Sequence, residues 1–253
     1  MKVYSVVNQK GGVGKTTTAV NLGVAMAKKG RRVLLIDLDP QGNLSTYLGV
    51  SDPQTTIADA IMDICNDKEP DIKKYIMRNP EGVDLIPSNL DLSGIELPLS
   101  QALGGQVALR DLISQLDNYD DVIIDCPPTL GILSINALAA STDVIVPVQT
   151  QFFAMKGLTD LIDTVERVKK KLNKELAIRG ILFTYYEKHT RSSKLVVSQV
   201  SETYKDRYPV FTVQIPKAIR AAESPLYGVS MFEYDPESPV TEAYASLCSE
   251  LLK

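Results

Sequence analysis

A glycine-rich run with two lysines and two threonines separates two segments of different periodicity near the start of the chain. The run, residues 10–17, reads KGGVGKTT. Residues 3–7 before it form a short apolar, β-branched segment typical of a buried strand, and residues 19–27 after it have the apolar pattern of a helix. Glycines let such a loop curl until its N–H groups face inward, and a helix N-terminus adds partial positive charge. The order strand, loop, helix predicts a phosphate-binding loop.

The remaining apolar runs predict the fold class. Short β-branched segments recur at residues 33–36, 122–124, 144–148 and 178–183, and residues 158–172 keep one apolar face at helical spacing. Strands that alternate with helices favour a parallel sheet covered on both faces. We therefore predict an α/β fold with three layers, in which helices cover both faces of a mainly parallel, twisted sheet. Ligands of such sheets bind at the carboxyl ends of the strands.

Composition narrows the possible functions. No linker, repeat or low-complexity run divides the 253 residues, so a single domain over residues 1–253 is expected. The net charge of −4 excludes a polycation that binds nucleic acid over its whole surface.

We expect a cytoplasmic protein, because no apolar run is long enough for a signal peptide or a membrane span. Cys65, Cys126 and Cys248 are too far apart for a zinc or redox motif.

Candidate chemistry follows three of the expected strands. In the loop, Lys15 is expected to meet the β- and γ-phosphates and the Thr16 hydroxyl to bind Mg²⁺. Asp37 and Asp39 leave the second strand on the same side, so that one supports Mg²⁺ and its waters while the other orients an attacking water. Asp125 ends the third strand and suits outer-sphere coordination of Mg²⁺. Aspartate after a strand is also a common turn former, which is the alternative for each position taken alone.

The lysine that opens the loop adds a resemblance. KGGVGKTT, with Lys10 beside two glycines, resembles the deviant P-loop, or deviant Walker A motif, of the ParA/MinD ATPases. In that family the early lysine reaches the nucleotide of a partner subunit, which implies a homodimer that forms around two ATP molecules. The resemblance also implies that Asp39 belongs to switch I and acts in hydrolysis, and that Asp125 has the Walker B role. Lys10, Lys15 and Asp39 are thus the expected catalytic residues.

The resemblance extends over nearly the full chain. It includes Gln149, Phe152, Phe153 and the segment IPKAIRAAESP at residues 215–225. In the family the Ile-Pro step borders the adenine, so Pro216 is a candidate base contact, although a proline that merely ends a strand fits the sequence equally well. The expected nucleotide-binding residues are Lys10, Gly11, Gly12, Val13, Gly14, Lys15, Thr16, Thr17 and Pro216.

The second half of the chain indicates whether the protein binds a membrane or DNA. The C-terminal segment has an apolar stripe at Val240, Ala243, Tyr244, Leu247 and Leu251, but its other side is not basic, so it should pack on the core rather than bind a membrane. Instead of a membrane, we expect the protein to bind double-stranded DNA without sequence preference. Such binding requires clustered cations. The candidates are Lys188, Arg191, Lys194, Lys217 and Arg220. Residues 187–194 form a longer stretch than in relatives, with His189 near an expected arginine.

Among members of the family, the chain most resembles the chromosome and plasmid partition ATPases. The resemblance implies slow ATP hydrolysis, a ParB-like centromere-binding partner that stimulates it, and association with the nucleoid. A ParA-like ATPase that positions other cargo, or a MinD-like spatial regulator, remains an alternative, because the partner selects the cargo. An ATP clamp with little turnover, an iron–sulfur ATPase and a biosynthetic ligase are further alternatives, although the cysteines do not suit a cluster.

Overall fold

The computed structural model describes residues 1–68, 70–150 and 154–253. Phe152 and Phe153, which the family resemblance included, lie outside the described residues. Its strands are β1 (Lys2–Val6), β2 (Val33–Asp37), β3 (Met77–Arg78), β4 (Val83–Ile86), β5 (Asp121–Asp125), β6 (Asp143–Gln149), β7 (Ala177–Tyr186) and β8 (Val210–Pro216). They form an eight-stranded sheet in the order β3-β4-β2-β5-β1-β6-β7-β8. Every neighbouring pair is parallel except β3 with β4.

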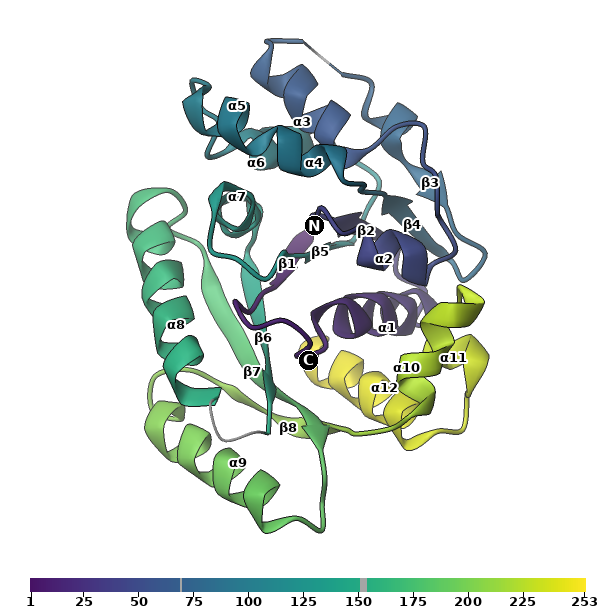
Figure 1. Cartoon of the computed structure of the whole chain (residues 1–253), viewed down its shortest axis with the longest axis vertical. Coiled ribbons are helices and arrows are strands. Elements are labelled where there is room, and N and C mark those ends of the chain that lie inside the picture. The colour runs from purple at the N-terminus through teal and green to yellow at the C-terminus, as the bar shows by residue number, and fades with distance from the viewer. Residues whose placement is uncertain (69, 151–153) are drawn as a thin grey trace.

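Helices lie on both sides of this sheet (Figure 1). One layer contains α1 (Lys15–Lys28), α2 (Asn43–Tyr47), α10 (Arg220–Glu223), the 3₁₀ helix η2 (Ser224–Tyr227), α11 (Met231–Tyr234) and α12 (Pro239–Leu251). The other contains α3 (Ile57–Cys65), the 3₁₀ helix η1 (Ile72–Tyr75), α4 (Asp91–Gly94), α5 (Glu96–Gln101), α6 (Ala108–Ile113), α7 (Ile132–Ala140), α8 (Ala154–Lys171) and α9 (Arg191–Tyr204). The predicted three-layer α/β fold is confirmed.

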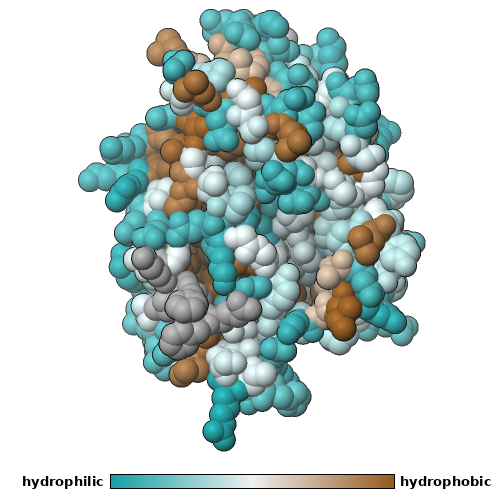
Figure 2. Space-filling model, in the orientation of Figure 1, coloured by the Kyte–Doolittle hydropathy of each residue, from teal (hydrophilic) through white to brown (hydrophobic). Residues whose placement is uncertain are grey.

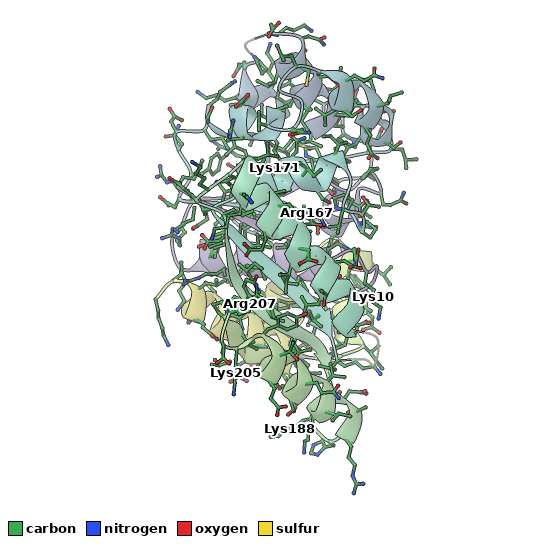
Figure 3. The ribbon with its side chains drawn as sticks, turned by 90° about the vertical axis from the view of Figure 1, so that its left-hand side faces the viewer. Lys10, Arg167, Lys171, Lys188, Lys205 and Arg207 are labelled. Carbon is green, nitrogen blue, oxygen red and sulfur yellow. The ribbon has the colours of Figure 1, made fainter. Side chains whose placement is uncertain are left out.

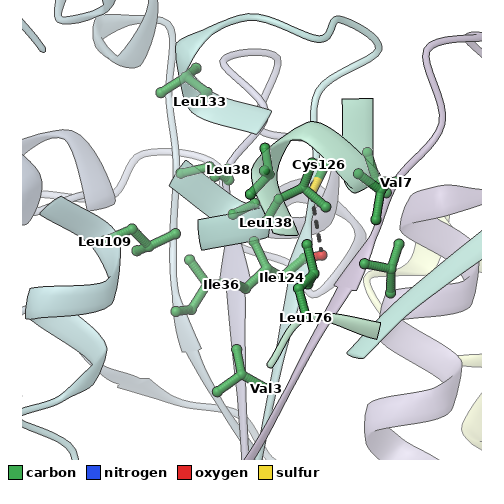
Figure 4. Packing of buried hydrophobic residues seen from close by; sticks show 14 of the residues in the cluster. Val3, Val7, Ile36, Leu38, Leu109, Ile124, Cys126, Leu133, Leu138 and Leu176 are labelled. Carbon is green, nitrogen blue, oxygen red and sulfur yellow. Dashed lines mark hydrogen bonds between the residues drawn. The ribbon is translucent and has the colours of Figure 1, made fainter. Parts of the chain in front are cut away.

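Successive side chains of each central strand enter two separate hydrophobic cores. In β2, Leu34 and Ile36 join the core under α3, α6, α7 and α8, whereas Val33 and Leu35 join the core under α1 and α12. Figure 4 shows Ile36 and Ile124 beside Leu109 and Leu138 in the first of these cores. Because both faces are covered, the strands are apolar at consecutive positions, which explains why the sequence revealed them.

The five predicted strands are confirmed, and three strands were missed. Neither β3 nor β4 exceeds four residues, and β8 is an edge strand whose side chains are half exposed, so none has a long apolar run. The prediction for the C-terminal stripe is also confirmed. Val240, Tyr244 and Leu247 of α12 are buried in the core shared with α1.

The surface carries hydrophobic side chains in separate small areas (Figure 2). One area lies where Figure 1 places α10 and α11, and the exposed hydrophobic residues of that segment are Ile219, Leu226 and Tyr227. None of the described helices has the length and apolar character needed to cross a membrane.

The sheet order brings three loops together. β1 lies between β5 and β6, and β5 lies between β1 and β2. The segments that follow β1, β2 and β5 therefore leave the sheet at neighbouring carboxyl ends, where helix N-termini and polar side chains gather. The phosphate loop, the pair Asp37 and Asp39, and Asp125 belong to these segments.

Candidate active site

The phosphate loop ends directly on the first turn of α1. Gly14 is the N-cap residue, with φ of 84°, a left-handed conformation that residues with a Cβ rarely adopt. No side chain caps this end of α1, and its first turn holds no acidic residue. The first N–H groups of a helix have no intrahelical acceptor, and here they combine with the positive end of the helix dipole. The loop thus offers an anion site.

Polar side chains from neighbouring strands hold the loop in place. The Asn8 amide oxygen accepts a hydrogen bond from the Lys10 N–H at 2.9 Å, while its amide nitrogen donates to a carbonyl of β6. From β7, the strand next to β6, the Thr184 hydroxyl donates to the carbonyl of Val13 at 2.9 Å. Both Asn8 and Thr184 are buried. The loop is therefore fixed before any ligand binds, which lowers the entropy lost on binding.

The two lysines of the loop differ in burial. Lys15 is only 7% exposed, and its Nζ lies 3.5 Å from the Lys10 carbonyl oxygen. Lys10 is exposed, and its Nζ lies 3.5 Å from Oε1 of Gln149, whose amide also donates to the Gly12 carbonyl. Figure 3 shows Lys10 at the edge of the molecule, at the end of α8 opposite Lys171. Lys15 thus lies within its own site, whereas Lys10 lies at the rim.

Asp125 and Thr16 form the centre of the site. The Thr16 hydroxyl donates to Asp125 Oδ2 at 2.6 Å. Asp125 Oδ1 is buried and has no hydrogen-bond partner among the described residues. Burial, followed by the nearby charge of Asp37, raises the pKa of Asp125 well above its usual value. A buried oxygen without a partner is costly, so it indicates a position where a cation or its water belongs.

The carboxylate of Asp37 is engaged by the helix that follows β2. The Ser45 N–H and hydroxyl donate to Asp37 Oδ2 at 2.8 and 2.7 Å, and the Asp39 N–H donates to Oδ1 at 3.2 Å. Burial raises the pKa of Asp37 to about 6, although these hydrogen bonds oppose the shift. Asp39 is 6% exposed and accepts the N–H of Gln41. Asp37 therefore ties the metal side of the site to α2.

These residues fit a magnesium ion that keeps most of its shell as water and phosphate oxygen. No group of three or more His, Cys, Asp or Glu side chains in the described part of the chain is arranged to bind a metal alone. Mg²⁺ characteristically binds one or two protein groups together with substrate phosphates and waters. The Thr16 hydroxyl and the free oxygen of Asp125 meet that requirement.

Comparisons with known proteins agree with this geometry. A family model described as an AAA domain matches residues 1–178. The sporulation initiation inhibitor protein Soj of Bacillus subtilis is 40% identical, over 99% of this chain and 98% of its own length. The chromosome partitioning protein ParA of Caulobacter vibrioides is 41% identical, over 100% and 94%. The chain belongs to the ParA/MinD family of P-loop ATPases.

Solved structures extend the likeness to three dimensions. Cobyrinic acid a,c-diamide synthase from Mycobacterium smegmatis, crystallised with an ATP analogue and magnesium, matches with a TM-score of 0.87 and 36% identity. The match covers 100% of this chain and 94% of that one. The ParA/MinD fold is therefore common to proteins named for different tasks, so the fold alone does not assign the task.

In this ParA/MinD chain, Pro216 lies beside the phosphate loop. Gly14, Thr17 and Pro216 line one small apolar pocket. Its remaining walls are Thr184, Tyr185, Ile215, Ala218, Ala221, Ala222, Val240 and Tyr244. The walls are mainly apolar, but the cavity of about 40 Å³ is smaller than a nucleotide base, so the walls must separate to admit one. Contact between Pro216 and a nucleotide base remains a prediction.

The two cations favoured for DNA contact already have carboxylate partners. Lys217 Nζ lies 3.2 Å from Oε1 of Glu187, and Arg220 Nη1 lies 2.7 Å from Oδ2 of Asp235. Both cationic side chains are more than half exposed, so these pairs contribute little to stability and can exchange partners. Lys188, Arg191 and Lys194 are exposed in and after the turn between β7 and α9. Their role in DNA binding remains a prediction.

Several residues that support the site lie outside the motifs that the sequence displays. Ser45, which holds Asp37, is eight positions away on α2, and Thr184 comes from a strand far along the chain. Neither belongs to the loop motif or to a hydrophobic period. A serine at the start of the helix after an acidic strand end is a local signal for Ser45, whereas only the pairing of β6 with β7 reveals Thr184.

Proposed function

We propose that this ParA/MinD ATPase drives the partition of DNA by switching between an ATP-bound dimer and a released form. The observation that carries the proposal is the buried Asp125, beside the open N-terminus of α1, with one oxygen bonded to Thr16 and the other without a partner in the part of the chain that the structure describes. That arrangement accommodates a triphosphate with its metal. Relatives named for chromosome partitioning match the chain over almost its full length, which supports partition as the task.

ATP and Mg²⁺ are the cofactors of this function, and the reaction is hydrolysis of ATP to ADP and phosphate. The N–H groups of the loop and Lys15 bind the phosphates, and Thr16 binds Mg²⁺, which neutralises charge on the phosphate oxygens. Asp125 and Asp37 would accept hydrogen bonds from water molecules bound to the metal. Asp39 orients the attacking water, for which its position after β2 and its burial are suitable. Little covalent chemistry is required of the protein, so positioning dominates.

Dimerisation depends on Lys10 in this proposal. Its exposure at the rim lets the ammonium group reach the nucleotide of a second copy once two loops face each other. Each site then lacks one cation until the partner arrives, so bound triphosphate favours the dimer. Loss of the γ-phosphate removes that attraction.

The dimer binds double-stranded DNA without sequence preference and thereby associates with the nucleoid. Two copies double the number of phosphate contacts, so the dimer binds far more tightly than the monomer. A ParB-like centromere-binding protein stimulates hydrolysis and releases the dimer. Residues 1–253 act as one ATPase domain, because the pocket beside the phosphate loop needs walls from both ends of the chain.

ATP turnover and DNA binding test the proposal together. We expect slow release of phosphate from ATP and Mg²⁺, faster release with DNA and a ParB-like protein, and DNA binding that requires ATP and falls steeply with salt. Equal DNA binding in ADP, or a strong preference for one short sequence, would contradict it.

Two other functions give different results in the same assay. A ParA-like ATPase for other cargo, or a MinD-like regulator, would dimerise with ATP but would not respond to a ParB-like protein. A synthase, as the Mycobacterium smegmatis neighbour is named, would require an organic acid substrate for turnover and would ignore DNA.

A further inference from the structure

A buried hydrogen bond joins two segments that belong to opposite ends of the candidate site. The Tyr47 hydroxyl on α2 lies 2.7 Å from the Ser224 hydroxyl at the start of η2. Tyr47 is 2% exposed and Ser224 is fully buried. A third buried side chain, Asn21 of α1, donates to the same tyrosine oxygen at 3.2 Å. None of these side chains lines the pocket, although Asn21 also donates to the carbonyl of Thr17, which does.

On one side of this bond lies the metal end of the site. Ser45, two residues before Tyr47 on α2, donates twice to the carboxylate of Asp37. Ser45 and Tyr47 belong to the same short helix, Asn43–Tyr47, and both are buried. Asp37 and Tyr47 are thus mechanically connected.

On the other side lies the base end. Ser224 follows α10 directly, and residues 218, 221 and 222 of the same segment form walls of the apolar pocket. The segment also carries Arg220. A second contact reinforces the attachment, because Gly49 and Gly228 approach so closely that a Cβ on Gly228 would lie 3.2 Å from the Gly49 Cα. The segment 217–228 therefore lies directly against the end of α2.

We propose that Tyr47 is a positioning residue that couples the metal end of the site to the base end through Ser224. With Mg²⁺ bound beside Asp37, the Asp37–Ser45 and Tyr47–Ser224 hydrogen bonds would hold α2 and segment 217–228 in one arrangement, and so fix the pocket walls that face the base. The inference rests on the proposed function, because it requires a nucleotide with Mg²⁺ in this site. Such coupling between two ligands is reciprocal, so base contact also favours metal binding.

Tyr47→Phe tests the proposal, because it removes one hydroxyl and keeps the buried ring. The affinity for ADP is measured with Mg²⁺ and with a chelator, and ADP avoids the effect of ATP-dependent dimerisation. We expect the factor by which Mg²⁺ tightens ADP binding to fall about fivefold, as for the loss of one buried hydrogen bond. Ser224→Ala should act alike, and the double variant should show no further loss.

Amide hydrogen exchange gives a second measurement. In the ADP-saturated wild type, added Mg²⁺ should slow exchange in residues 217–228, and in Tyr47→Phe it should not. Tyr75→Phe is the matched control, since it removes a hydroxyl that bonds Asp63 on α3, and it should behave as the wild type does.

The outcomes separate the two proposals. A wild type that binds no ADP in either condition contradicts the proposed function. If the wild type binds and Tyr47→Phe weakens binding equally with and without Mg²⁺, or not at all, the coupling is wrong while the proposed function stands.

Discussion

The phosphate end and the base end of the site are held by different kinds of contact. Around the phosphate loop, Asn8, Thr184, Asp37 and Asp125 are buried and belong to strands of one sheet or the residues just after them. Around Pro216, the phosphate loop and β7 form part of the walls, the rest come from β8, the segment after it and α12, and the charged residues Lys217 and Arg220 of that segment are exposed. The first end is fixed without ligand, whereas the second can respond to one.

This difference assigns separate tasks to the two ends. A site fixed by buried hydrogen bonds keeps catalytic groups in place for hydrolysis. Segments with few buried contacts belong to the low-stability part of a structure and can change with the bound ligand. Chemistry should therefore depend on the phosphate end, and DNA affinity on the base end and its neighbours.

The largest expected effect concerns hydrolysis at the phosphate end. Asp39→Ala should lower ATP turnover about a thousandfold, as for loss of a group that orients or deprotonates water, while the ATP-bound dimer persists. Phosphate release and sizing chromatography with ATP measure the two properties. Asp52→Ala, which removes an exposed carboxylate after α2, is the control and should leave both unchanged. Normal turnover in Asp39→Ala would remove Asp39 from the mechanism.

Binding at the same end gives the next largest effect. Lys15→Ala should weaken ATP binding about a hundredfold, because it removes a buried, charge-assisted contact to phosphate, and dimerisation should disappear with it. Titration calorimetry and sizing chromatography provide the measurements. Lys29→Ala, at the other end of α1, should bind ATP normally. A Lys15→Ala protein that still dimerised with ATP would refute the assignment.

A moderate effect should appear in the pH dependence of stability. The pKa of Asp125 is raised in the folded state, so the folded protein binds this proton more tightly than the unfolded chain does. Protonation of Asp125 therefore stabilises the fold at low pH, and this stabilisation is lost as pH rises through the folded pKa. In chelator, Asp125→Asn should therefore melt several degrees above the wild type at neutral pH, and the gain should vanish at about pH 4. Thermal melts at several pH values measure this gain. A gain independent of pH would show that charge burial is not its cause.

The smallest effects should come from the exposed cations of the base end. Lys217→Ala should weaken DNA binding about fivefold and lower the salt slope by about one, whereas Glu187→Gln, which releases Lys217, should strengthen binding about twofold. Binding isotherms at several salt concentrations give both quantities. Lys68→Ala removes a cation paired with Asp63 elsewhere and is the control. Unchanged DNA binding in both Lys217→Ala and Glu187→Gln would contradict a DNA contact of Lys217. Lys188, Arg191 and Lys194 would then be the next candidates.

The features that could be predicted from the sequence lie mainly in the central strands and at the phosphate end of the site. The strands β1, β2, β5, β6 and β7 could be predicted because burial on both faces leaves consecutive apolar residues. The loop could be recognised because a phosphate loop needs its glycines, lysine and threonine in one local order, and the structure brings Asp37 and Asp125 beside it while their roles stay predictions. Edge strands β3 and β8 lack that apolar signal, and partners such as Glu187 for Lys217 depend on side chains that no local rule relates.

By itself, the sequence determined the fold class, the phosphate loop and the positions of Lys15, Asp39 and Asp125, since each depends on residues within one strand–loop–helix unit. The tertiary structure alone decided that Thr184 holds the phosphate loop, that Asp125 keeps an oxygen without a partner among residues 1–68, 70–150 and 154–253, and that Tyr47 meets Ser224. Tyr47 and Ser224 are 177 positions apart. The physical reason is that burial and pairing over such separations depend on how α1, α2 and η2 pack, which no local pattern records.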